Sequence, residues 1–150
     1  HVDSIKQVVT WANENQEIEF HWALHPNPNT RKLILEIFNN KPENVIFTEP
    51  LNYTEAIKKM AASRLLISDS GGIQEEAPSL QKRVLILREE TERPEVLDCN
   101  CGILVGSNIK IIKENFYKIW NNPSEYIFKS ENNPFGDGKA SEKIYKDVVK

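Results

Sequence analysis

Short apolar runs alternate along this sequence with amphipathic stretches in which the apolar residues recur at helical spacing. The apolar runs predict strands at residues 17–24, 45–48, 64–68, 84–87 and 102–105. The amphipathic stretches predict helices at residues 2–13, 30–39, from 52 onward, 71–80, 94–99, 109–120 and at both ends of the tail 123–150. Strand and helix therefore follow one another about five times.

This alternation is typical of an α/β protein, because a strand, a crossover helix and the next strand form one parallel unit. We therefore predict a doubly wound, Rossmann-like parallel sheet with helices on both faces. Runs such as 84–87 are apolar throughout, which suits strands buried on both sides. In such sheets ligands bind outside the carboxyl ends of the strands. Here those ends carry His25, Glu49, residues 69–72, residues 88–93 and Gly106.

Two helix starts carry local signals. Asn52 is an expected N-cap, and Glu55 follows three residues later, at the distance of a capping box. Pro94 is expected at the first position of its helix, where its missing N–H costs nothing.

Length and charge narrow the class of protein. A chain of 150 residues suits one domain with its own core, so residues 1–150 are predicted to form a single domain. The net charge of −3 argues against a protein that binds nucleic-acid backbones. It leaves room for one nucleotide, since a few backbone N–H groups can hold a phosphate.

Membrane, secretion and metal signals are not found in the sequence. The longest apolar runs are far shorter than a bilayer span, and no basic and apolar leader opens the chain. Cys99 and Cys101 lack further soft ligands nearby, so we expect structural thiols, no metal site and no disulfide. These observations predict a cytoplasmic protein without membrane or nucleic-acid partners.

The strongest candidate for chemistry is residues 68–76, which read SDSGGIQEE. A strand ends there, two glycines follow, and a helix begins whose first N–H groups are unpaired. Ser70, Gly71 and Gly72 could hold a phosphate, and Glu76 could accept from ribose hydroxyls. The alternative is a capped helix start with a solvated glutamate, since the motif lacks the lysine of a P-loop.

Three further segments have two interpretations each. Residues 88–95, REETERPE, contain Arg93 and are either a phosphate-binding loop or a solvated charged one. His25, in the segment HPNPN, either contacts ligand or bonds backbone in a turn. Residues 133–141, NPFGDGKAS, favour a turn that docks the last helix.

Taken together, these segments resemble the non-hydrolysing UDP-N-acetylglucosamine 2-epimerases. The resemblance rests on DSGGIQEEAPSL at 69–80, TERPE at 91–95, the histidine motif at 25–29 and the segment 133–141, in the family's order. It implies a glycosyltransferase-B-type architecture of two doubly wound domains, of which this chain is the C-terminal, nucleotide-binding one. It also implies elimination of UDP across C1–C2 of the sugar and re-addition after inversion at C2, without a cofactor.

The resemblance also implies roles for individual residues. Ser70 and the amides of Gly71 and Gly72 would hold the diphosphate, and Glu76 would bind the ribose. Arg93 would face the nucleotide-sugar cleft, and His25 would contact substrate or an activating UDP-N-acetylglucosamine.

The chain departs from the family in ways that limit what it does alone. The family's acid/base carboxylates lie on an N-terminal domain outside residues 1–150, so we expect UDP binding without epimerisation. Residues 54–56 and Asn132 also differ from the usual motifs, which leaves the uracil contacts open. Expected partners are UDP or UDP-N-acetylglucosamine, the N-terminal domain and a second copy in a homodimer. The alternatives are a free-standing UDP-sugar-binding module and the C-terminal half of a glycosyltransferase.

Overall fold

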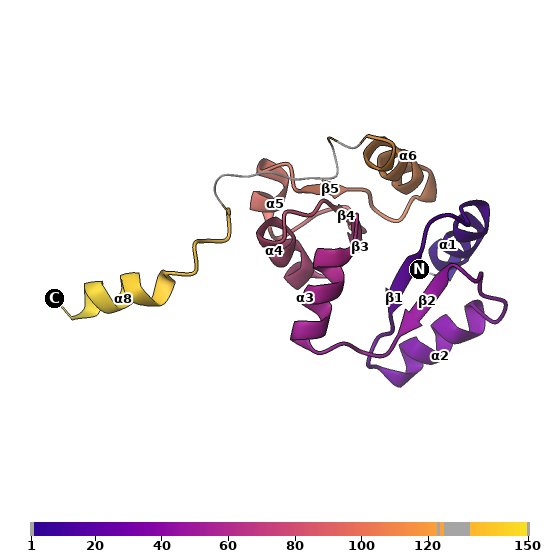
Figure 1. Ribbon diagram of the computed structural model, residues 1–150, viewed down its shortest axis with the longest axis horizontal. Helices are drawn as coiled ribbons and strands as arrows, with labels where there is room; N and C mark the ends of the chain where they lie inside the picture. Colours follow the sequence, from indigo (N-terminus) through magenta and orange to yellow (C-terminus); the bar gives the residue numbers. More distant parts are fainter. Residues whose placement is uncertain (1, 123, 125–132, 150) are drawn as a thin grey trace. The chain divides into compact units, whose positions relative to one another are not determined.

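Helices and strands alternate in the computed structural model, which describes residues 2–122, 124 and 133–149 (Figure 1). The strands are β1 (Phe20–Ala23), β2 (Val45–Thr48), β3 (Leu66–Ser68), β4 (Val84–Ile86) and β5 (Gly102–Leu104). The helices are α1 (Val2–Glu14), α2 (Pro28–Ile37), α3 (Tyr53–Ala62), α4 (Gly71–Ser79), α5 (Pro94–Asp98), α6 (Ile109–Trp120) and α8 (Ala140–Val148). The helix predicted from residue 123 onward falls largely outside the described residues.

All paired strands run parallel, which confirms the predicted α/β class. β1 lies beside β2, with Phe20 opposite Val45. β4 lies between β3 and β5, so that Leu66, Val84 and Gly102 are in register. The strands thus form a two-stranded and a three-stranded sheet, where the sequence alone suggested one sheet.

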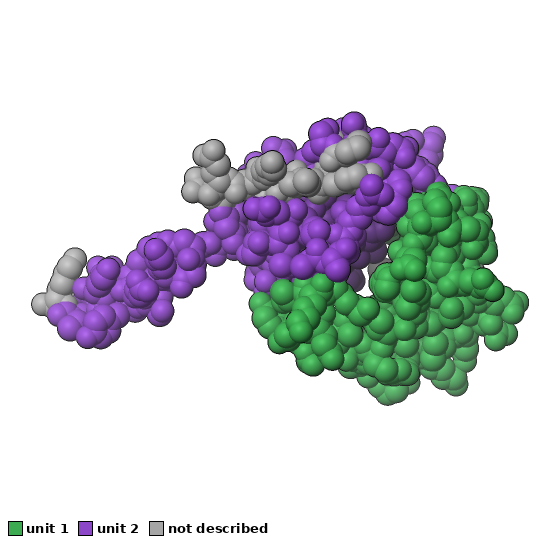
Figure 2. Space-filling view, in the orientation of Figure 1, with its two compact units in different colours: residues 1–59, 107–109 green, residues 60–106, 110–150 purple. Residues whose placement is uncertain are grey.

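The chain divides into two compact units, which Figure 2 colours separately. One contains residues 1–59 and 107–109, and the other contains residues 60–106 and 110–150. Each unit has its own apolar core, described in turn below. The assignment of residues 1–150 to one nucleotide-binding domain stays a prediction.

In the first unit, α1 and α2 supply apolar side chains to the β1–β2 sheet. Phe38, just after α2, meets Trp22 and Phe47 edge-on, with ring centroids 5.1 Å apart in each pair. Around them lies a buried cluster of Ala12, Leu24, Ile34, Phe38 and Val45. Edge-to-face aromatic pairs add to the stability that burial provides.

A buried asparagine closes this unit at the end of α1. The side-chain N–H₂ of Asn44 donates to the carbonyl oxygens of Ala12, Asn15 and Ile18, each at 2.9 Å. The backbone oxygen of Asn44 accepts from the N–H of Phe20, the first residue of β1. Asn44 therefore fixes the turn between α1 and β1 against the start of β2.

In the second unit, β4 lies at the centre of the core. Val84, Leu85 and Ile86 are fully buried, as predicted for a strand covered on both sides. The surrounding cluster consists of Leu66, Ala77, Val84, Ile86, Val96 and Cys101. The stripe Ile112, Phe116 and Ile119 of α6 is also buried, as its spacing predicts.

Several element boundaries differ from the sequence prediction by one to three residues; β3, for example, begins at Leu66 and not at residue 64, and β4 and β5 each end one residue earlier than expected. α2 begins at Pro28 and not at Thr30, because Asn27 caps it by accepting from the N–H groups of Asn29 and Thr30. β1 begins at Phe20 and not at residue 17, because Asn15 and Asn44 hold the preceding residues in a turn.

The start of α3 confirms the predicted capping box. The N–H of Glu55 donates to Asn52 Oδ1 at 3.0 Å, and the N–H of Asn52 donates to Glu55 Oε2 at 3.1 Å. The side chain of each residue thus satisfies a backbone N–H of the other. Pro94 likewise stands in the first turn of α5, as predicted.

Cys101 is a core thiol with a strongly perturbed pKa. Its Sγ–H donates to the Lys82 oxygen, and burial, followed by the neighbouring Cys99, raises its pKa to about 12. A raised pKa keeps the neutral thiol in the folded state, so this contribution to stability is complete below the ordinary pKa. It is lost as the pH rises towards 12.

We expect iodoacetamide at pH 8 to alkylate half-buried Cys99 in the folded chain and to spare Cys101 until urea unfolds it. Only the thiolate reacts, and Cys101 is both covered and protonated. Peptide mass spectrometry distinguishes the two sites. Equal labelling of both thiols in the folded chain would contradict this account.

Candidate functional site

The turn between β3 and α4 presents hydrogen-bond donors at the start of a helix. Ser70 is the N-cap residue of α4, with φ −75° and ψ 128°, and its hydroxyl makes no capping bond. The first intrahelical bond runs from the N–H of Gln74 to the oxygen of Ser70. The N–H groups of Gly71 and Gly72 precede that bond, so they have no partner within the helix.

Such a helix start attracts anions, because its N–H groups carry the positive end of the helix dipole. Ser70 is exposed, and its hydroxyl can add one further donor. A side chain at Gly72 would meet Ser70 Oγ alone, at 3.8 Å, so the space in front of this residue is open.

The Arg93 guanidinium lies against Gly71. A Cβ atom placed on Gly71 would stand 3.2 Å from Arg93 Cζ and 3.4 Å from both Nε and Nη2. A side chain at this position would force the guanidinium to move away by a few tenths of an ångström. The structure therefore brings together Ser70, Gly71, Gly72 and Arg93, which the sequence analysis proposed for one site.

Two carboxylates hold Arg93 in this place. Arg93 Nε donates to Glu75 Oε1 at 2.7 Å, and Nη1 donates to Glu92 Oε2 at 3.0 Å. The hydrogen bond and the charge of Glu75, with a smaller effect of Glu92, raise the pKa of Arg93 above its ordinary value. The arginine side chain is 32% exposed, so it is fixed in position and still reachable from solvent.

A second arginine connects the two loops at this edge of the sheet. Arg88 Nε donates to the backbone oxygen of Asp69 at 2.7 Å. The loop after β4 is thereby joined to the turn after β3. Sequence reasoning singled out the charged run but did not place Arg88 or Glu75 in the site. The signals that could have placed them were the position of Arg88 just after β4 and that of Glu75 in the first turns of α4.

Glu76 lies on α4, half-buried, five residues after Gly71. At a rise of about 1.5 Å per residue, this separates it from the helix start by roughly 7.5 Å along the axis. That spacing agrees with a ligand that reaches from a phosphate to a ribose. The role of Glu76 stays a prediction.

His25 belongs to the first unit and follows β1. Its Nδ1 accepts from the backbone N–H of Asn27 at 3.0 Å, which is the turn contact that the sequence analysis kept as an alternative. In the neutral ring the hydrogen therefore resides on Nε2. A contact between His25 and substrate or activator stays a prediction.

The segment 133–141 docks against the second unit, as expected of a turn. Asn133 Nδ2 donates to Ser79 Oγ at 2.7 Å, at the end of α4. Phe135 packs on the core around Val84 and Ile86. Asp137 accepts from the N–H of Lys139 at 3.0 Å, before α8 begins.

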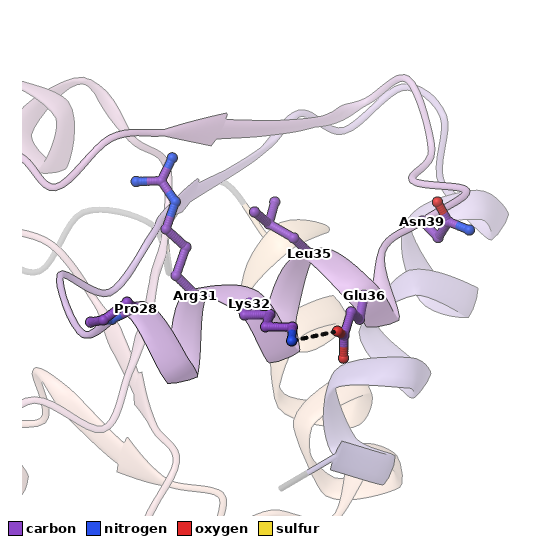
Figure 3. Close-up of a pocket in the computed structure, with 6 residues that line it drawn as sticks. All are labelled: Pro28, Arg31, Lys32, Leu35, Glu36 and Asn39. Carbon is purple, nitrogen blue, oxygen red and sulfur yellow. Dashed lines mark ion pairs between the residues drawn. The ribbon is translucent and has the colours of Figure 1, made fainter.

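A hollow along α2 contains none of these residues. Figure 3 shows its lining side chains projecting from α2 and its ends, with Lys32 Nζ 3.8 Å from Glu36 Oε1. The lining residues are Pro28, Arg31, Lys32, Leu35, Glu36 and Asn39. Two of the lining cations are already paired, Lys32 with Glu36 and Arg31 with Glu49, so the start of α4 remains the better candidate site for an anion.

The described residues hold neither a membrane-spanning helix nor a cluster of metal ligands. No helix among residues 2–122, 124 and 133–149 combines the length and the apolarity needed to cross a membrane. Within the same residues, no three His, Cys, Asp or Glu side chains gather as a metal ion would require.

The fold and the start of α4 together define a parallel α/β protein with a candidate anion site. The model of the UDP-N-acetylglucosamine 2-epimerase family matches residues 1–149, and the chain belongs to that family.

Individual relatives agree with this assignment. The UDP-N-acetylglucosamine 2-epimerase of Campylobacter jejuni is 41% identical over 140 residues, which cover 93% of this chain and 36% of that protein. A crystal structure of the Neisseria meningitidis enzyme bound to UDP-GlcNAc superposes with a TM-score of 0.87 at 38% identity, covering 99% of this chain and 40% of that one. A structure of S. aureus MnaA with UDP gives 0.85 at 32% identity, covering 98% and 40%.

The chain thus spans about 40% of the length of these relatives. The solved relatives have a glycosyltransferase-B-like fold, and this chain matches a C-terminal half of it, as the resemblance implied.

Proposed function

We propose that the parent protein interconverts UDP-N-acetylglucosamine and UDP-N-acetylmannosamine, and that this chain supplies the UDP-binding half. The supporting observation is the Arg93 guanidinium against Gly71, beside the unpaired N–H groups of α4. Family membership and the UDP-containing structures of relatives support the choice of ligand.

In the proposed reaction a base removes the proton at C2 of the sugar while the C1–oxygen bond breaks and UDP departs as an anion. A C1=C2 double bond remains in the sugar. The proton then adds to the opposite face of C2, and a UDP oxygen forms the new bond at C1. Neither half-reaction consumes an oxidant or a reductant.

Within this scheme the chain acts on the departing diphosphate. Ser70, the amides of Gly71 and Gly72, and Arg93 are fixed donors that stabilise the negative charge as it develops on the leaving group. Glu76 binds the ribose hydroxyls, and His25 contacts the sugar nucleotide. The C2 base comes from the remainder of the parent protein, because proton abstraction needs a group placed at the other side of the sugar.

The proposal extends to the binding partners of this chain and to its location in the cell. We expect the remainder of the parent to be the essential partner, a homodimer as the assembly, and the cytoplasm as the location. The free thiols Cys99 and Cys101 agree with a reducing compartment.

Calorimetric titration of the 150-residue chain with millimolar UDP tests the binding half of the proposal. We expect weak binding, and we expect Ser70→Ala to reduce it by about 1–3 kcal/mol, as for a hydrogen bond to a charged group. Ser141→Ala, an exposed serine on α8, serves as the control and should leave the affinity unchanged. A folded chain that gives no heat with UDP counts against the proposal.

The reaction itself is tested on the parent protein. Incubation with UDP-N-acetylglucosamine should give the C2 epimer, which proton NMR distinguishes by the coupling between H1 and H2. Transfer of the sugar to an acceptor would instead indicate a glycosyltransferase. The isolated chain should show neither activity.

A further inference from the structure

One hydroxyl joins α4 to the loop that carries Arg93. Thr91 Oγ1 donates to Gln74 Oε1 at 2.5 Å and accepts from the backbone N–H of Arg93 at 3.1 Å. Gln74 stands four residues into the helix whose start forms the candidate site. The connection therefore runs from the interior of α4, through Thr91, to the main chain of the residue that covers Gly71.

The glutamine of this connection is buried. Gln74 is 1% exposed, and within the described part of the chain no atom accepts from its Nε2. Burying an amide with one hydrogen-bonding atom unsatisfied costs stability, and an apolar side chain would fill the space without that cost. What the amide does provide is an acceptor, since its Oε1 receives the hydrogen bond from Thr91.

Arg93 is held both at its guanidinium and at its backbone N–H. Glu75 and Glu92 hold its tip, at 2.7 Å and 3.0 Å. Both carboxylates are well exposed, so these ion pairs are screened by solvent. Thr91, which is half-buried, accepts the hydrogen bond from the backbone N–H of Arg93 and so holds the main chain of this residue.

We propose that Gln74 and Thr91 are positioning residues that hold the Arg93 guanidinium at the start of α4, ready for the diphosphate of the ligand. The inference rests on the proposed UDP binding and adds two residues that contact no ligand themselves. A guanidinium already in place loses little freedom on binding, which favours the complex.

The test compares two variants that differ in the hydroxyl. Thr91→Val keeps the size of the side chain and removes the bridge, whereas Thr91→Ser keeps the hydroxyl. NMR titrations with UDP and with uridine, which lacks the diphosphate, report on each variant. We expect Thr91→Val to weaken UDP binding roughly fivefold, the size of one hydrogen bond, with uridine binding unchanged. Thr91→Ser should bind UDP as the unaltered chain does.

Gln74→Met is the second variant, because it fills the buried space without an amide. It should weaken UDP binding as Thr91→Val does, again with no effect on uridine. In an Arg93→Met background, Thr91→Val should cause no additional loss, since the guanidinium that it positions is gone.

Equal weakening of UDP and uridine, or an additional loss in the Arg93→Met background, would show a purely structural role and overturn the inference. UDP binding that depends on Arg93 and not on Thr91 or Gln74 would overturn it as well, leaving the proposed function intact. Failure of the unaltered, folded chain to bind UDP would overturn the proposed function, and this inference with it.

Discussion

Replacing Arg93 by methionine should lower the affinity for UDP by about 2–4 kcal/mol, roughly 30- to 1,000-fold, the largest loss that we expect at this site. The change removes a positive charge and two or more N–H donors, and charge-assisted bonds are about twice as strong as neutral ones. Methionine keeps much of the length of the side chain, so the loop after β4 should keep its path. Calorimetric titration with UDP measures the loss.

Arg64→Met is the matched control. It makes the same change in net charge, but Arg64 precedes β3, and its guanidinium lies over the ring of Trp120, 4.5 Å from the centroid. This is the amino end of the strand, away from the start of α4. The control should bind UDP within about twofold of the unaltered chain, well under one 1.4 kcal/mol step. Equal losses in both variants would indicate a general charge effect and would remove Arg93 from the site.

Replacing Asn44 by alanine should destabilise the chain by about 2–4 kcal/mol, because it removes a buried donor shared by three carbonyl oxygens and leaves a cavity. The side chain that is lost serves the oxygens of Ala12, Asn15 and Ile18. The first two of these also accept backbone N–H groups, so most of the cost is expected at Ile18 and in the small cavity. Urea unfolding followed by tryptophan fluorescence measures the change.

Asn40→Ala provides the comparison, since Asn40 is an exposed asparagine shortly before Asn44. Its effect should stay within about 0.5 kcal/mol, as for most surface positions. An Asn44 variant as stable as the Asn40 variant would mean that the turn between α1 and β1 holds without this side chain.

Local signals in the sequence correctly predicted several features of this fold. The Asn52–Glu55 capping box and the start of α4 after Ser70 depend on residues a few positions apart, which a sequence displays directly. The buried character of β4 follows from its uninterrupted apolar run. Ser70, Gly71 and Gly72 were proposed for the site because unpaired N–H groups after a glycine pair at a helix start suit a phosphate, and this role stays a prediction.

Contacts between distant segments could not be read in the same way. Gly71 and Arg93 are separated in sequence by a helix and a strand, and only the register of β3 and β4 brings them together. The hydrogen bond between Gln74 and Thr91 also depends on the pairing of β3 with β4, and neither residue type alone predicts it. The late start of β1, at Phe20, depends on Asn44, far along the chain, and was missed for this reason.

The carboxylates around Arg93 have a consequence for how a ligand is taken up and released. Because Glu75 and Glu92 already pair with the guanidinium, a diphosphate bound as proposed would exchange one set of counter-ions for another. The electrostatic free energy gained on binding is therefore smaller than at an arginine without carboxylate partners. A singly charged anion such as chloride would gain little from this exchange. Under the proposed function, the same carboxylates would pair with the arginine again when the nucleotide departs, which would lower the cost of emptying the site.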